Sequence, residues 1–150
     1  MKQGLCLLFA ALTIASPMSW ACSYDGQFNN PFSESYPGSL DVAIATQQAI
    51  KSQTIAAPQR LEGGQGLRRA SWWLNLMVES NPNLPSGTYI YLVDSQLWSQ
   101  YQPDKRLAVH VSAPESTANV LLISEAALGS VISDKITLDK AEELGLVIRG

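Results

Sequence analysis

The chain has 150 residues, a hydrophobic fraction of 46% and a formal net charge of −3 at neutral pH. This length suits a single domain with one core. Ten basic side chains stand against thirteen acidic ones, without a basic stripe. Because nucleic-acid backbones are bound by clustered Lys and Arg, we expect no nucleic-acid partner.

Residues 1–21 have the pattern of a secretory signal peptide. Lys2 supplies the positive start, residues 5–14 the apolar run, and Ser19-Trp20-Ala21 a small-x-small cleavage site. The apolar run is too short to span a bilayer, and no later stretch approaches the roughly 20 apolar residues that a span requires. We therefore expect an exported, periplasmic protein whose mature chain begins at Cys22 and has no transmembrane segment.

The fate of Cys22 has two interpretations. Cys6 leaves with the signal peptide, so the mature chain keeps one cysteine and forms no internal disulfide. An Ala-Cys junction also ends bacterial lipoprotein signals, which makes Cys22 a candidate lipidation site and a lipid anchor the alternative to a soluble form. Against lipidation, Ser19 stands where those signals usually carry Leu, and Pro17 interrupts the apolar run.

Residues 22–38 are dense in turn formers, and Gly26 and Pro31 argue against a regular helix. This aromatic arm carries four rings spaced by four residues: Tyr24, Phe28, Phe32 and Tyr36. Either the rings pack on the domain's own surface, or they anchor the arm on a partner protein.

Residues 39–150 predict one α+β domain, a small antiparallel or mixed sheet of three to five strands with helices packed on one face. We expect a helix over 39–55 with Ser39 as its N-cap, a flexible connection over 56–66, and an amphipathic helix over 67–80. Strands are expected at 88–93, 107–112 and 119–123, with a short helical turn over 95–101.

The C-terminal block has the clearest local signals. Ser124 and Thr137 are placed to cap two short helices, and Gly145 to end the second in a left-handed conformation. Residues 146–149 then predict a closing strand.

This block resembles the C-terminal half of sterol-carrier-protein domains. The resemblance covers residues 119–150: the strand ending in Ser124-Glu125, the helix after it, the turn over 134–138, the helix over 140–145 and the last strand. It extends to residue 67 if the preceding helix and strands match the earlier elements of the family. Asp134 stands where the family usually has Gly, and the sequence stops at Gly150, where the family continues into a helix over its apolar tunnel. The resemblance implies a non-catalytic fold that binds an apolar ligand, covered here by the N-terminal helices or the aromatic arm.

We expect a ligand pocket between the sheet and the 67–80 helix, with an aromatic wall made of Trp72, Trp73, Tyr91, Trp98 and Tyr101. Phosphate binding by the Gly63–Gly66 run before Arg68 and Arg69 is disfavoured, because no strand precedes the run.

No metal centre and no cofactor are expected, because His110 is the only histidine and the cysteines are too few for a conventional site. His110 is expected to be half-exposed or hydrogen-bonded, with an acid/base role as the alternative. A Cys22–His110 nucleophile pair is disfavoured, since a terminal cysteine on an arm lacks fixed geometry.

These observations favour a non-catalytic exported binding or accessory protein of a bacterial envelope. The partner would be an apolar small molecule. The alternative is an interaction or assembly subunit that docks another envelope protein through the aromatic arm. A hydrolase or redox enzyme is the third hypothesis.

Overall fold

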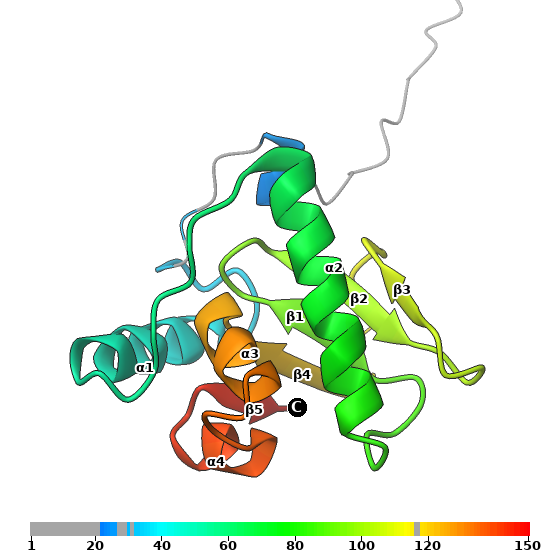
Figure 1. Ribbon diagram of the computed structural model, residues 1–150. Coiled ribbons are helices and arrows are strands. Elements are labelled where there is room, and N and C mark those ends of the chain that lie inside the picture. Colours follow the sequence, from blue (N-terminus) through cyan, green and yellow to red (C-terminus); the bar gives the residue numbers. More distant parts are fainter. Residues whose placement is uncertain (1–21, 27–29, 31, 116–117) are drawn as a thin grey trace, which may run out of the picture.

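The computed structural model describes residues 22–26, 30, 32–115 and 118–150. The expected signal peptide, its cleavage point and Phe28 lie outside these residues. A five-stranded mixed sheet forms the centre, with helices α2 and α3 across one face, as Figure 1 shows. The prediction of an α+β domain is confirmed.

The sheet has strand order β3-β2-β1-β4-β5. Its strands are β1 (Tyr89–Leu92), β2 (Leu97–Tyr101), β3 (Leu107–Val109), β4 (Val120–Ile123) and β5 (Val147–Arg149). β1, β2 and β3 form an antiparallel meander, and β4 returns to pair with β1 in parallel. The α3–α4 helix pair then leads to β5, antiparallel to β4.

Side chains along the central strands point alternately to the two faces of the sheet, so the hydrophobic core is divided into two clusters. Ile90 and Leu92 face a large cluster that includes Leu74 and Met77 of α2 (Gly63–Ser80). Tyr91, between them, faces the opposite side of the sheet, because successive strand residues point to opposite faces.

The second cluster lies under the C-terminal part of the arm. Tyr36 packs edge-on against Trp98 with 5.0 Å between ring centroids, and Ser35 hydrogen-bonds the Tyr91 hydroxyl at 2.9 Å. Helix α1 (Ser39–Lys51) contributes Val42 to this cluster and Ala49 to the larger one. The expectation that the helices pack on one face therefore holds for α2 and α3 but not for the whole of α1.

The C-terminal helices begin and end where the sequence predicted. The Ser124 hydroxyl accepts from the Ala127 N–H at the start of α3 (Glu125–Ile132), and Thr137 does the same for Lys140 at the start of α4 (Leu138–Glu143). Gly145 has φ of +72°, which a side chain would disfavour.

Three predicted elements were wrong in detail. Residues 95–101 form a tight turn and strand β2, not a helical turn; Leu97, Ser99 and Tyr101 alternate along it, a period that also suits a strand. The glycine run begins α2 and is not part of the connection. Helix α1 ends at Lys51 and its N-cap is Gly38, one residue before Ser39.

The 3-10 turn η1 (Ser23–Asp25) joins the arm to the domain. The Ser23 N–H donates to the Ser95 carbonyl at 2.9 Å, and Tyr24 lies against Gly66 of α2. Among the described residues, no helix is both long enough and apolar enough to cross a membrane.

Candidate functional site

A cleft of about 950 Å³ opens where η1, α1 and the starts of α2 and α3 meet. Residues 57–62 of the connection between α1 and α2, together with Gly63 at the start of α2, form part of its lining. Its lining includes the charged side chains Arg69, Asp94 and Glu125, together with Tyr24 and Ser95. This volume is in the range of small-molecule sites.

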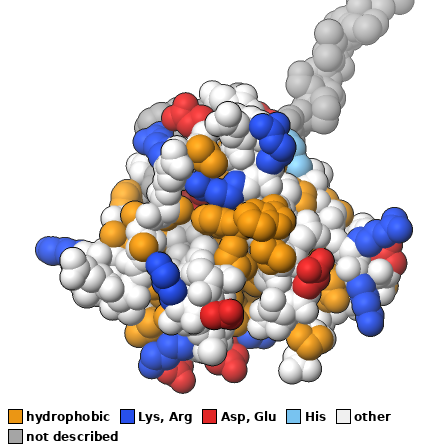
Figure 2. Space-filling view, in the orientation of Figure 1, with side chains coloured by type: hydrophobic (Ala, Val, Ile, Leu, Met, Phe, Trp, Pro, Cys, Tyr) orange, Lys and Arg blue, Asp and Glu red, His pale blue; other side chains and the backbone are white. Residues whose placement is uncertain are grey.

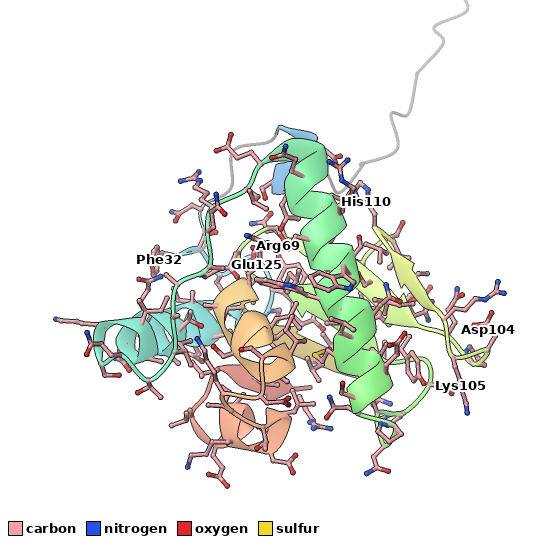
Figure 3. All side chains as sticks on the ribbon, in the orientation of Figure 1. Phe32, Arg69, Asp104, Lys105, His110 and Glu125 are labelled. Atoms are coloured by element: carbon pink, nitrogen blue, oxygen red, sulfur yellow. The ribbon has the colours of Figure 1, made fainter. Side chains whose placement is uncertain are left out.

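An ion pair lines the cleft. Arg69 Nη2 is 3.1 Å from Oε2 of Glu125, and each side chain is only 13% exposed. Figure 3 shows the two residues meeting between α2 and α3. Arg69 also donates to the Gln59 carbonyl and lies 4.8 Å from the ring centroid of Trp73. The guanidinium is therefore held on several sides.

Glu125 is held by its carboxyl group from η1 and α2 and by its backbone from the turn after β1. Tyr24 of η1 donates its hydroxyl hydrogen to Oε1, and the backbone N–H of Glu125 donates to Oδ2 of Asp94, after β1. Burial raises the pKa of Glu125 to about 7, against the opposing influence of Arg69, which favours the carboxylate. Burial also raises the pKa of Asp94. Protonation of Glu125 near neutral pH would leave Arg69 without a counter-charge.

Two polar atoms just beneath the cleft surface have no described hydrogen-bond partner. They are Nε of Arg69 and Oγ of Ser95, and both residues line the cleft. Buried polar atoms in proteins are nearly always hydrogen-bonded. A small movement of either side chain would offer a donor to a bound polar group.

The predicted aromatic wall is not brought together around one pocket. Tyr91 and Trp98 lie in the cluster under the arm, whereas Tyr101 belongs to the core beneath α2. Trp73 packs on that core next to Gly129, and Trp72 is 62% exposed. Figure 2 shows hydrophobic side chains gathered near the centre of the face seen in Figure 1, with charged side chains around them.

The described rings of the arm have different surroundings. Tyr24 and Tyr36 pack on the domain, as one of the two interpretations of the arm predicted. Phe32 is 51% exposed, and in Figure 3 it lies away from the Arg69–Glu125 pair.

Cys22 is fully buried, and the fold places it beside His110. The thiol Sγ is 3.7 Å from Nε2 of His110 and 3.6 Å from Oδ2 of Asp25. Oδ2 of Asp25 is in turn 3.1 Å from the same His110 nitrogen. The expectation that Cys22 lacks fixed geometry was wrong, because the next residue, Ser23, bonds the Ser95 carbonyl in the turn between β1 and β2.

This trio does not have the arrangement of a nucleophilic triad. In a triad the acid holds one ring nitrogen and the nucleophile contacts the other, whereas here both groups meet Nε2. Burial and then the Asp25 carboxylate raise the pKa of Cys22 to about 11, the opposite of an activated thiol. The geometry therefore argues against thiol catalysis.

Sequence reasoning missed the Arg69–Glu125 pair and the role of Asp25. Glu125 was interpreted only as part of the strand end and helix start after Ser124, and Arg69 as a residue of the 67–80 helix for which phosphate binding was disfavoured. One local signal for the trio was present, since Cys22-x-x-Asp25 within a single turn places two polar side chains together.

No protein-family model, no curated protein and no solved structure matches this chain. Function is therefore argued from the cleft and from the residues around it.

Proposed function

We propose that the protein is a non-catalytic exported binding protein that holds a small amphipathic molecule in the cleft, with an anionic head group at Arg69. The observation that carries the proposal is the largely buried Arg69–Glu125 pair that lines a cleft of about 950 Å³. An arginine fork binds carboxylate oxygens in pairs, so a ligand carboxylate suits it.

Protonation of Glu125 removes the counter-charge of Arg69, so that a ligand carboxylate can pair with Arg69 instead. With a pKa of about 7, this carboxyl group exists in both forms near neutral pH. When it is protonated, Arg69 keeps its charge in a largely desolvated position, where an unpaired charge is costly. A ligand carboxylate then replaces Glu125 as the counter-ion, so binding is accompanied by proton uptake.

The apolar part of the ligand would lie along the apolar side chains of the cleft lining. The side chains there come from α1, the connection and α3: Ile50, Ala57, Pro58, Leu61 and Ala126. Burying a short alkyl chain against them contributes about 0.8 kcal/mol per methylene. The combination favours a medium-chain amphiphile over a purely apolar or purely polar molecule.

The strand–helix–helix–strand order of β4, α3, α4 and β5 supports the resemblance to sterol-carrier domains, which bind apolar ligands. The cleft borders the N-terminal elements η1 and α1, which agrees with a ligand covered from that side. We keep the sterol-carrier relationship as part of the proposal.

Native mass spectrometry of the exported protein, followed by titration of the ligand-free form with octanoate and octanol, tests the proposal. We expect the octanoate affinity to exceed that of octanol, and Arg69→Gln to remove that difference. Arg68→Gln, an exposed neighbour on the same helix, is the matched control and should bind as the wild type does. Absence of a co-purifying amphiphile together with no uptake of either probe would refute the proposal.

A second function, docking of another envelope protein through the aromatic arm, is favoured by the exposed Phe32 ring. Phe32→Ala should then abolish capture of that protein while octanoate binding is unchanged. An unaltered set of captured envelope proteins would contradict this alternative.

A further inference from the structure

Three potential metal-ligand atoms form a compact triangle on the side of η1 away from the cleft pair. They are Sγ of Cys22, Oδ2 of Asp25 and Nε2 of His110. The edges measure 3.6 Å from sulfur to oxygen, 3.7 Å from sulfur to nitrogen and 3.1 Å from nitrogen to oxygen. The three atoms therefore surround a single point, at which one metal ion would contact all of them.

These separations match a tetrahedral zinc site. Zinc bonds of about 2.3 Å to sulfur and about 2.0–2.1 Å to nitrogen and oxygen, arranged tetrahedrally, place ligand atoms about 3.3–3.6 Å apart. Each observed edge lies within a few tenths of an ångström of that range. A metal ion therefore fits the triangle with only small movements of the side chains.

Local structure fixes all three residues. Cys22 and Asp25 are three apart around a 3-10 turn, a spacing at which side chains eclipse, and the Asp25 N–H bonds the Cys22 carbonyl at 3.0 Å. His110 follows β3 with φ of +64°, an uncommon conformation for a residue with a side chain. Strained backbone of this kind concentrates at functional sites, where it orients a particular side chain.

We propose that Cys22, Asp25 and His110 form a binding site for a zinc-type divalent cation. One thiolate, one imidazole and one carboxylate suit Zn²⁺, whereas Mg²⁺ and Ca²⁺ prefer oxygen ligands and Cu⁺ prefers sulfur. The Asp25 and His110 side chains are 40% and 38% exposed, so solvent reaches the site and supplies the fourth ligand. This inference is independent of the proposed ligand cleft.

Export would add a further ligand. If the signal peptide is cleaved before Cys22, that residue carries a free α-amino group two carbons from its thiol. Nitrogen and sulfur at that spacing close a five-membered ring on a metal ion, and such an amine would take the place of the solvent ligand.

The sequence provides a unique reporter for two of the three ligands. His110 is the only histidine of the chain, and Cys22 is the only cysteine after residue 21. Titration of the mature protein with Co²⁺, the spectroscopic substitute for Zn²⁺, should give a thiolate-to-cobalt charge-transfer band and the visible bands of tetrahedral cobalt. Zn²⁺ should bleach these bands and shift the single imidazole signal in nuclear magnetic resonance spectra.

Three variants test the ligands one at a time: Cys22→Ser, Asp25→Asn and His110→Gln. Each should weaken Zn²⁺ binding by more than about 100-fold. Substitution of a residue that only orients a metal ligand has a smaller effect on affinity. Asp104→Asn, an exposed aspartate in the β2–β3 loop, is the control that should bind Zn²⁺ normally.

A circular-dichroism melt of each variant separates loss of a ligand from loss of the fold. A variant that fails to fold is replaced by the milder change Asp25→Glu or His110→Asn. Absence of the charge-transfer band in the folded wild type would overturn the proposal. Zn²⁺ affinity that is the same in the Asp25 and His110 variants as in the wild type would overturn it as well.

Discussion

Tyr24 donates a hydrogen bond from its phenolic hydroxyl to Oε1 of Glu125, 101 residues further along the chain. Tyr24 stands between Ser23, which bonds Ser95 in the turn between β1 and β2, and Asp25, which contacts His110. The turn η1 therefore contributes to two places at once, the carboxyl group in the cleft lining and the Cys22–Asp25–His110 cluster.

Gly66 is the residue that lets Tyr24 approach α2. A Cβ at this position would lie 2.7 Å from Cδ1 of Tyr24 and 2.8 Å from the Leu61 carbonyl oxygen. We expect Gly66→Ala to displace η1 and to destabilise the protein by about 1–3 kcal/mol, as overpacking does.

Gly64→Ala is the matched control for this change. Its Cβ would meet only the flexible end of Arg68, at 3.6 Å, and alanine improves helix propensity by up to about 1 kcal/mol. Denaturant unfolding of both variants measures the contrast, and equal stabilities would contradict the packing described for Tyr24.

Glu125 should make stability depend on pH. Its pKa is about 7 in the folded state and near 4.5 when unfolded, so between these values the folded protein holds a proton that the unfolded chain has lost. The contribution of this group to the free energy of unfolding is fully present below about pH 4.5 and is lost as pH rises through about 7. The total loss is at most about 3 kcal/mol.

Unfolding of the wild type and of Glu125→Gln at several pH values measures this effect. The wild type should lose more stability than the variant as pH rises through the window. Parallel curves would show that burial does not raise the Glu125 pKa.

The capping residues Ser124 and Thr137 differ in burial, so their replacement should lower the free energy of unfolding by different amounts. The Ser124 hydroxyl is fully buried, caps α3 and also accepts from Thr46 at 2.8 Å, whereas Thr137 caps α4 at the surface. Ser124→Ala should cost about 2 kcal/mol, because it leaves the Thr46 hydroxyl unpaired, and Thr137→Ala about 1 kcal/mol. Thermal or denaturant unfolding compares them, and a larger cost at Thr137 would contradict the buried network.

The Cys22 thiol should be unmodified and slow to react. A sulfur with no exposed surface leaves no path for a diacylglycerol chain. The intact mass of the protein isolated from its native host should lack a lipid, and iodoacetamide should react quickly only after unfolding. A single-thiol control, Lys105→Cys combined with Cys22→Ala, should react quickly when folded, since Lys105 is exposed. A lipid mass on Cys22 would instead support the anchored form.

The elements with local signals were predictable from the sequence. Ser124, Thr137 and Gly145 mark helix boundaries through bonds within a few residues, and the structure has those boundaries. Strand β2 was missed because Leu97, Trp98 and Tyr101 fit two periods, and only pairing with β1 decides between them.

The candidate sites depend on contacts between distant parts of the chain, so sequence patterns could not reveal them. Arg69 and Glu125 are 56 residues apart, and Cys22 and His110 are 88 apart. Cys22 and His110 were each considered for another role, and nothing in the sequence joined Arg69 to Glu125. The packing of α2 against α3 brings Arg69 to Glu125, and η1, which packs on α2 and bonds Ser95 in the β1–β2 turn, brings Cys22 to His110.

The most direct test of the proposed function is octanoate binding measured by calorimetry at about pH 6 and about pH 8.5, with the wild type and Glu125→Gln. The wild type should bind at least about tenfold more tightly at the lower pH, because Glu125 must be protonated before Arg69 accepts a new counter-ion. In Glu125→Gln the affinity should be the same at both values. Equal wild-type affinities, or the same pH dependence in the variant, would contradict the exchange of counter-ions at Arg69.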